Sequence, residues 1–336
     1  MITPSPVCLE STSWQRQLAD AVTDTRELLH LLGLDAHTWA DPPLHDSDFP
    51  LRVPRYFVDL MRPGDPDDPL LAQVLPRRRE LDPTPGFDRD PVGDLAASRD
   101  HGILQKYQGR ALMVTTGACA VHCRYCFRRH FPYAEASGLR DWRRALERVG
   151  QLPGTDELIL SGGDPLTLSD ARLGQLLTEA AGIPGLRRLR IHTRLPVVLP
   201  ARITQALASM LADNRLQTVF VIHANHPNEL TPTLDQALER LREADPGIWL
   251  LNQAVLLKSV NDDADTLVDL SEKLASLRVM PYYLHLLDRV AGAAHFDVDA
   301  GRARRLMAAI RARLPGYLVP ALVREQAGKT GKSPVW

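Results

Sequence analysis

Cys119-Ala-Val-His-Cys123-Arg-Tyr-Cys126 places three of the chain's four cysteines on one short stretch. Three thiolates spaced C-x3-C-x2-C can bind three irons of a cubane 4Fe-4S cluster and leave the fourth iron without a protein ligand. Such an iron can chelate the amino and carboxylate groups of S-adenosylmethionine and pass an electron into its sulfonium, which releases a 5'-deoxyadenosyl radical. The spacing therefore predicts a cluster held by Cys119, Cys123 and Cys126.

Two other interpretations of the same stretch remain open. The cysteines could form a zinc knuckle that His122 or His130 completes, or they could be three unrelated buried thiols. A disulfide framework is not expected, because three of four cysteines are clustered and thiolate ligands of a cluster require a reducing compartment. The remaining cysteine, Cys8, is expected to be a free thiol.

Composition and charge favour a cytoplasmic protein that binds neither nucleic acid nor a membrane. Lys and Arg number 40 against 41 Asp and Glu, so the net charge of -1 creates no overall field that would attract a polyanion. The N-terminus lacks a basic segment followed by an apolar one, and no apolar run reaches the roughly eighteen residues of a membrane span. The basic run Arg124, Arg128, Arg129 and His130 could bind nucleic acid, but capture of carboxylate and phosphate groups is the simpler explanation.

From residue 110 onward, short apolar runs alternate with amphipathic stretches. Six such alternations predict a parallel sheet with right-handed crossovers, and hence an α/β fold with a partial (β/α)6 barrel. We expect residues 1–105 to form an N-terminal helical and Pro-rich wrap that includes a helix over 13–33, residues 106–318 the barrel, and residues 319–336 a C-terminal segment. The predicted strands are 111–115, 157–161, 188–192, 218–223, 249–253 and 280–285, and the predicted helices lie near 139–150, 169–182, 200–213, 232–244 and 263–277.

Polar side chains stand at or near the ends of the predicted strands. They are Ser161, His192, His223, Gln253 and His285. Because parallel α/β folds place their active sites at the carboxyl edge of the sheet, we expect these side chains to gather there.

Ser161-Gly162-Gly163-Asp164 directly follows the second of these strands. Two glycines allow the backbone to approach a ligand closely, and free carbonyl groups at a strand edge can accept hydrogen bonds from an ammonium group. By itself the same stretch is also typical of an ordinary turn.

The cysteine spacing, followed by Phe127, resembles the radical S-adenosylmethionine superfamily, and the Gly162-Gly163-Asp164 stretch is similar to the superfamily motif that holds the methionine amino group. The similarity becomes more specific in a series of motifs that appear in the same order in lysine 2,3-aminomutases, from about residue 50 to the end. These motifs are Lys106-Tyr-Gln-Gly-Arg110, Cys126-Phe-Arg128-Arg129, His192-Thr-Arg-Leu-Pro196, His223-Ala-Asn-His-Pro-Asn228, Asn252-Gln-Ala-Val-Leu-Leu257 and Gly331-Lys332-Ser-Pro-Val335.

The resemblance implies an isomerase, of the intramolecular aminotransferase type, with three cofactors: a 4Fe-4S cluster, S-adenosylmethionine and pyridoxal 5'-phosphate. By matching position, Lys332 is the lysine that bonds pyridoxal phosphate. The further implied contacts are Tyr107 and Arg110 for pyridoxal phosphate; Ser161, Gly162, Gly163, Asp164, His223 and Gln253 for S-adenosylmethionine; and Arg128 for the substrate carboxylate.

These assignments have simpler alternatives. Lys332 could be a solvated lysine in a Gly-rich tail. A nucleotide loop of the G-x4-G-K-[ST] type is excluded, because Val323 and Gln326 occupy the places where its first glycine is needed. His223 and His226 could bind zinc, although no third ligand lies at a suitable spacing.

The substrate end of the pattern departs from the family. Where most lysine 2,3-aminomutases hold the distal ammonium of lysine with two aspartates, the resemblance places His285 and Glu325, so Glu325 is expected to be the only carboxylate there. The stretches 122–133 and 282–296, and a chain that ends four residues after Lys332, resemble the subgroup that makes (R)-β-lysine from L-lysine for elongation factor P.

That resemblance implies a functional link to elongation factor P and its lysyl ligase, and an external electron donor such as flavodoxin. A homo-oligomer is left open. The alternatives are a free-lysine aminomutase of β-lysine metabolism and, from a different class, a non-catalytic iron-sulfur or zinc protein.

Overall fold

The computed structural model describes residues 13–36, 39–98, 102–133 and 142–336. Cys8 and the first residues of the helix predicted near 139–150 lie outside these ranges. Within the described residues, nine strands form one sheet in the order of the sequence, β1 to β9. Their bounds are β1 Ile103–Leu104, β2 Arg110–Thr116, β3 Glu157–Gly162, β4 Arg188–Thr193, β5 Gln217–Ile222, β6 Trp249–Leu256, β7 Met280–Leu286, β8 Ala321–Arg324 and β9 Ser333–Pro334.

The predicted α/β fold is confirmed, because the six predicted strands are β2 to β7 and every neighbouring pair among them is parallel. Short runs rich in Leu, Ile and Val form these strands, and β3 is buried along its whole length. Such continuous apolar strands are expected when both faces of a parallel sheet are covered. The sheet continues into β8, parallel to β7, so the strand series runs one step beyond the prediction.

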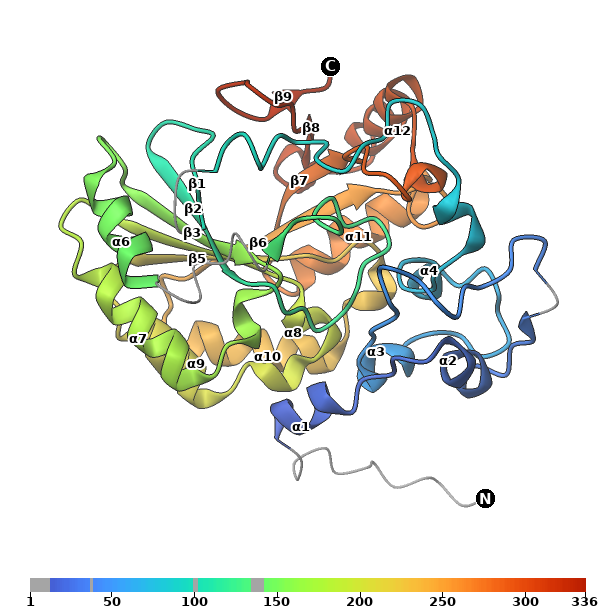
Figure 1. Cartoon of the computed structure of the whole chain (residues 1–336), viewed down its shortest axis with the longest axis horizontal. Coiled ribbons are helices and arrows are strands. Elements are labelled where there is room, and N and C mark those ends of the chain that lie inside the picture. The colour runs from blue at the N-terminus through green and yellow to red at the C-terminus, as the bar shows by residue number, and fades with distance from the viewer. Residues whose placement is uncertain (1–12, 37–38, 99–101, 134–141) are drawn as a thin grey trace.

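Helices between the strands form an outer layer. Figure 1 shows α6, α7, α9 and α10 side by side outside the strands, and neighbours in this row contact one another. Helices α7, α10 and α11 begin after Ser169, Thr231 and Asp263, whose side chains accept hydrogen bonds from backbone N–H groups of the first turn. The bounds in the barrel are α6 Trp142–Gln151, α7 Asp170–Ala181, α8 Leu195–Val198, α9 Gln205–Ala212, α10 Pro232–Ala244, α11 Ala264–Ser276 and α12 Ala300–Arg311, with 3-10 turns η5 Pro165–Thr167, η6 Pro200–Arg202, η7 Pro227–Glu229, η8 Ala294–Phe296 and η9 Gly316–Leu318.

The continuous helix predicted over 13–33 is wrong. The chain forms two short helices, α1 Trp14–Ala19 and α2 Thr25–Leu31, separated by an extended segment. In that segment Val22 exchanges backbone hydrogen bonds with Val53, and Asp24 caps α2. Val22, Leu28, Leu29 and Leu32 are buried, but a strand-like contact with a distant segment interrupts the helix.

The N-terminal segment packs on the barrel rather than forming a core of its own. One cluster of buried apolar side chains contains Phe57 of the N-terminal segment together with Leu177 of α7 and Ile191 of β4. Helix α3 contacts α8, and the Tyr56 hydroxyl lies 2.6 Å from Oγ1 of Thr231, which caps α10. In Figure 1 this segment, in blue, lies beside α8. Its elements are α3 Arg55–Val58, α4 Pro69–Ala72 and η3 Arg78–Leu81.

The C-terminal segment is a hairpin. Strand β9 pairs antiparallel with β8, in the register Val323 with Pro334 and Arg324 with Ser333. This register brings the two ends of the connecting loop, Glu325 and Lys332, opposite each other beside the carboxyl end of β7. In the described part of the chain no helix is long and apolar enough to cross a membrane.

Candidate active site

A cavity of about 670 Å³ opens at the carboxyl edge of the parallel strands, and every site residue predicted from the sequence lines it. Residues at or beside the ends of strands from β2 to β9 therefore line one cavity, as the strand-end pattern predicts. Its walls also include His192, Asp94, Lys106, Arg190, Arg194 and Asp288. The predicted residues on the wall are Tyr107, Arg110, Cys119, Cys123, Cys126, Arg128, Ser161, Gly162, Gly163, Asp164, His223, Gln253, His285, Glu325 and Lys332.

The three cysteines are free thiols on the loop that follows β2. Burial, together with the neighbouring Cys123, raises the pKa of the Cys126 thiol to about 11, and burial raises the pKa of Cys119 well above its usual value. Thiols that repel one another when ionised are stabilised by a bound cationic centre. Among the described residues, no three His, Cys, Asp or Glu side chains lie close enough to share a single metal ion. In a cubane cluster each thiolate binds a different iron, so the three sulfurs need not meet at one ion.

Gly162 and Gly163 pack directly against the start of the cysteine loop. A Cβ at Gly162 would lie 2.5 Å from the Thr116 carbonyl oxygen, and one at Gly163 would lie 2.2 Å from that of Ala118. The backbone N–H of Gly163 donates to Thr116 and that of Asp164 to Ala118. The close approach that the glycines allow is therefore to the protein's own backbone, which ties the end of β3 to the cysteine loop.

The carboxylate of Asp164 is buried and accepts hydrogen bonds from protein groups. Its donors are the hydroxyl of Thr193 and the backbone N–H groups of Leu166, Arg194 and Leu195, at 2.8 to 3.0 Å. Burial raises the pKa of Asp164 above its usual value, against the lowering effect of these donors. The carboxylate therefore anchors the turn that follows β4.

Buried polar atoms without a hydrogen-bond partner among the described residues line the same cavity. They include Nε2 of His192, Oε1 of Gln253 and Oδ1 of Asp288. Burial lowers the pKa of His223 to about 4 and that of His192 well below its usual value, so both rings are neutral near pH 7. Neutral histidines and a free amide oxygen are suited to hydrogen bonds with a polar ligand, since buried polar groups are rarely left unpaired.

Arg128 is held by two neighbours. Its Nε donates to Oδ2 of Asp94 at 2.6 Å, and its Nη1 donates to Oγ of Ser161 at 3.0 Å. Lys106 lies 2.6 Å from the other carboxylate oxygen of Asp94. The lowering effects of Arg128 and Lys106 outweigh burial, so the pKa of Asp94 lies below its usual value. Asp94 is thus a fixed anion that orients two cations at the cavity wall.

Glu325 and Lys332 form an ion pair at the mouth of the hairpin loop. Nζ of Lys332 lies 3.1 Å from Oε2 of Glu325, and the hydroxyl of Tyr107 donates to Oε1 of Glu325 at 2.5 Å. The guanidinium of Arg110 lies over the ring of Tyr107 at 5.3 Å, and Nζ of Lys332 lies 5.6 Å from the centre of the Tyr283 ring. An amine, a guanidinium and two aromatic rings therefore occupy this side of the cavity.

Glu325 is not the only carboxyl group on this wall of the cavity, because Asp288 lines it as well. Asp288 is two residues past the end of β7, which contains His285. Burial raises the pKa of Asp288 to about 7, opposed by the nearby Lys332 and reinforced by Glu325. Its position after a strand is the signal that could have identified it from the sequence.

Replacing Asp288 by asparagine should change the pH dependence of stability. The folded pKa of about 7 exceeds the unfolded value of about 3.9, so the folded state binds the extra proton. Ionisation of Asp288 is therefore less favourable in the folded than in the unfolded protein. As pH rises from about 4 to about 7, the free energy of unfolding falls by up to about 4 kcal/mol because of this group. Asp288→Asn should therefore gain stability relative to wild type over this range. Urea unfolding of both cofactor-free proteins at pH 5 and pH 8 measures the difference, and the exposed Asp213→Asn serves as the control. An equal difference at both pH values would contradict the assignment.

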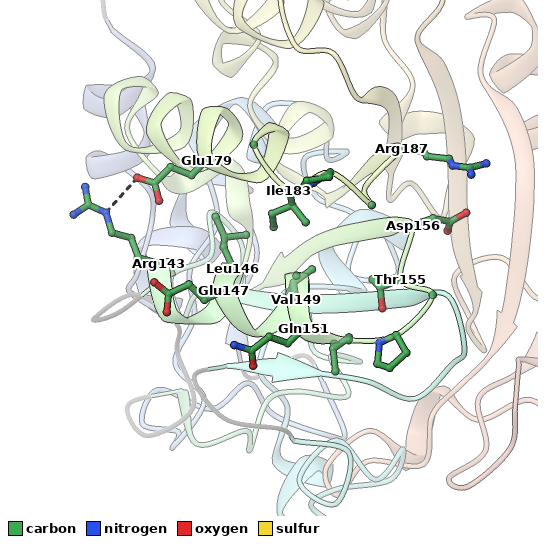
Figure 2. A pocket seen from close by; sticks show the side chains of 17 residues that line it. Arg143, Leu146, Glu147, Val149, Gln151, Thr155, Asp156, Glu179, Ile183 and Arg187 are labelled. Atoms are coloured by element: carbon green, nitrogen blue, oxygen red, sulfur yellow. Dashed lines mark hydrogen bonds and ion pairs between the residues drawn. The ribbon is translucent and has the colours of Figure 1, made fainter.

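A second hollow, of about 980 Å³, lies between α6 and α7 and the loops that precede β3 and β4 (Figure 2). Figure 2 shows Arg143 and Glu179 paired at its rim. Nε of Arg143 lies 3.2 Å from Oε1 of Glu179. It is larger than the first cavity but lies at the amino end of the strands. Since parallel α/β folds place their chemistry at the carboxyl end, the smaller cavity is the candidate active site.

Residues 113–270, from β2 to α11, match the family described as the Radical SAM superfamily. The chain is also 51% identical to the L-lysine 2,3-aminomutase of Escherichia coli (strain K12), an alignment that covers 96% of this chain and 94% of that protein. The chain belongs to the lysine 2,3-aminomutase family of radical SAM enzymes. The enzyme of that name from Haemophilus influenzae is 44% identical, covering 98% and 97% of the two chains, and that from Clostridium subterminale is 32% identical, covering 96% and 77%.

Membership of the lysine 2,3-aminomutase family identifies the chain as an isomerase and confirms that part of the prediction. A radical SAM family also implies a 4Fe-4S cluster and S-adenosylmethionine. The donor set in the cavity fits both groups, because three clustered thiols face the same space as the unpaired atoms of His192 and Gln253.

Proposed function

We propose that this chain converts L-lysine to (R)-β-lysine with the cluster, S-adenosylmethionine and pyridoxal 5'-phosphate. The observation that supports this most strongly is the position of Lys332. Its amine enters the cavity that the three cysteines line, paired with Glu325 on the opposite side of one hairpin. A lysine so placed can serve a reaction at the cluster, whereas a solvated tail lysine could not.

For pyridoxal phosphate, Lys332 supplies the amine and Arg110 a cation. Among the described residues Arg110 has no carboxylate partner, although it lines the cavity. A guanidinium binds phosphate oxygens with two parallel hydrogen bonds, which suits Arg110 to the phosphate group. Tyr107 lies between Arg110 and Lys332. Its ring packs against the Arg110 guanidinium, and its hydroxyl donates to Glu325, the ion-pair partner of Lys332. When bound, the group would provide an electron sink for the migrating nitrogen.

We assign Cys119, Cys123 and Cys126 as the ligands of the cluster. We assign the neighbouring strand ends to S-adenosylmethionine. The backbone of Gly162 and Gly163 lies beside the cysteine loop. The carbonyl groups of Ser161 and Gly162 each accept one hydrogen bond, from Thr115 and Tyr133, and keep a second lone pair for an ammonium group. Asp164 keeps that backbone in place through the turn after β4. His223 and Gln253, 3.4 Å apart, offer neutral donors and acceptors on the next two strands.

For lysine itself, the cavity provides charges at two places. Arg128, oriented by Asp94, would bind the carboxylate. Glu325 and Asp288 would bind the distal ammonium, with His285 as a neutral neighbour, since burial and then the nearby Lys332 keep its pKa well below the usual value. A buried ammonium without a counter-charge costs several kcal/mol. Two carboxyl groups, one ionised and one with a pKa near 7, can compensate it.

Glu325→Gln should weaken lysine binding while S-adenosylmethionine is still cleaved. The substitution keeps the shape of the side chain but removes its charge. A hydrogen bond to a charged group contributes about 1.5–3 kcal/mol, so the KM for lysine should increase roughly tenfold to hundredfold. Steady-state kinetics give KM, and lysine-independent formation of deoxyadenosine reports cleavage. Glu272→Gln, at an exposed position of α11, is the matched control. An unchanged KM would place the distal end of lysine elsewhere.

An anaerobic assay tests the proposed reaction. Protein reconstituted with iron and sulfide is mixed with L-lysine, S-adenosylmethionine, pyridoxal phosphate and a reductant such as reduced flavodoxin, and chiral chromatography separates the products. (R)-β-Lysine supports the proposal. A protein that cleaves S-adenosylmethionine but leaves lysine unchanged would refute the proposal. A protein that binds iron and changes neither S-adenosylmethionine nor lysine would favour a non-catalytic iron-sulfur protein.

We further propose that the product serves elongation factor P, in line with the sequence stretches that resemble that subgroup. Deletion of the gene in its host should remove the β-lysyl mass from elongation factor P, and feeding β-lysine should restore it. If the mass is unchanged while free β-lysine disappears from the cell, the product serves free β-lysine metabolism instead.

A further inference from the structure

Arg194, in the turn that follows β4, contacts one of the proposed cluster ligands. Its Nη1 lies 2.7 Å from Sγ of Cys123, and only 5% of the residue is exposed. Within the described part of the chain, no other cationic side chain donates a hydrogen bond to a cysteine sulfur, although the backbone N–H of Arg128 bonds Cys126. In the sequence, Arg194 lies within the motif His192-Thr-Arg-Leu-Pro196, and its neighbours along the chain do not indicate what its charge interacts with.

Arg194 is fixed at both ends. At the backbone, Asp164 accepts its N–H group at 2.8 Å, so the Gly162-Gly163-Asp164 stretch positions the turn. At the guanidinium, Nη2 donates to Gln73 at 2.7 Å and to Glu229 at 3.1 Å. A side chain that is held in this way cannot turn away from Cys123 without breaking buried hydrogen bonds.

The guanidinium of Arg194 contacts one carboxylate, one cysteine sulfur and the hydroxyl of Tyr125. Glu229 is a single anion, and it also accepts hydrogen bonds from Gln73 and from the backbone of Asn225. Arg194 therefore retains attraction for a second anion, and the atom in reach is Sγ of Cys123. Hydrogen bonds and positive charge at the sulfurs of an iron-sulfur cluster favour its reduced, more negative state.

We propose that Arg194 is a positioning residue that holds Cys123 and raises the reduction potential of the cluster. The proposal rests on the cluster assignment made above. In this proposal Asp164 also acts on the cluster indirectly, because its carboxylate fixes the backbone of Arg194 and thereby the position of the guanidinium beside Cys123. It also connects helix α4, through Gln73, to the electron-accepting centre.

The test is the midpoint potential of the cluster in the reconstituted full-length protein, measured by redox titration with electron paramagnetic resonance detection, together with iron and sulfide content. Arg194→Gln should shift the midpoint to more negative values. We expect the reduced fraction at a fixed potential to fall about tenfold, which for a one-electron couple is about 59 mV. Glu229→Gln removes the competing anion and should shift the midpoint in the opposite direction.

Arg202→Gln is the matched control. Arg202 is another buried arginine, eight residues further on, that donates to the Leu166 carbonyl and pairs with Asp170 and has no hydrogen bond to a cysteine sulfur. Its loss should lower stability without moving the midpoint.

The proposal is overturned if Arg194→Gln keeps its iron and the wild-type midpoint, or if Arg202→Gln shifts the midpoint equally. If Arg194→Gln fails to assemble a cluster, the sign for Glu229→Gln decides: a positive shift supports the proposal and an unchanged midpoint overturns it. If the wild-type protein itself binds no iron after reconstitution, the cluster assignment fails, and this proposal fails with it.

Discussion

Lys332→Ala is expected to abolish β-lysine formation and the covalent attachment of pyridoxal phosphate. The amine of Lys332 lines the cavity and pairs with Glu325 at 3.1 Å. The other cavity amine in the described part of the chain, that of Lys106, lies 3.8 Å from Glu325 and is held by Asp94 at 2.6 Å. An alanine leaves no nucleophile there, and covalent catalysis requires one. Cleavage of S-adenosylmethionine should continue at a reduced rate, because the cysteine loop belongs to a different segment of the cavity wall.

Lys329 provides the matched control. It lies three residues earlier in the same hairpin loop, but its side chain is exposed and does not line the cavity. Borohydride reduction followed by peptide mapping should find pyridoxal phosphate on the peptide with Lys332 in wild type and in Lys329→Ala. Label on Lys329, or product formed by Lys332→Ala, would disprove the assignment.

Cys119→Ala, Cys123→Ala and Cys126→Ala are each expected to lose the cluster and all activity. A cubane held by three thiolates loses one of its three protein ligands in each variant. Iron and sulfide should fall from about four per chain to well below one, with loss of the visible charge-transfer absorption.

Cys8→Ala is the control for these variants and should keep the full iron content. Cys8 is separated by over a hundred residues from the cysteine loop in sequence. If strictly anaerobic protein carries zinc in place of iron, or if one of the three loop variants retains a full cluster, the ligand assignment fails.

The strands were the most predictable part of the fold. Leu158 to Leu160 or Val219 to Ile222 form uninterrupted apolar runs, and such runs have few alternatives to a buried parallel strand. Helix α11 was similarly predictable, since Asp263 caps an amphipathic stretch. The helix expected over 13–33 failed for a different reason. Its break depends on a backbone pairing between Val22 and Val53, and local periodicity contains no information about a partner thirty-one residues away.

The candidate site was predictable to the extent that its residues occur in local motifs. Cys119, Cys123 and Cys126 lie on one loop, so their spacing alone indicates a shared ligand. Lys332 was identified through a resemblance in its neighbours. Asp288 was missed because it stands two residues beyond its strand, where its side chain could equally have faced solvent. Only its burial beside Glu325 and Lys332 distinguishes it.

The sequence by itself determined the order of strands and helices, the cluster spacing and the family, because these depend on residue type and on short separations along the chain. The tertiary structure alone decided which charges meet. Arg194 reaches Cys123 across 71 residues, and Tyr107 reaches Glu325 across 218. Such contacts form because parallel strands bring all their carboxyl ends to one edge, and the resulting pairing depends on the register and burial of distant segments, which no local pattern encodes.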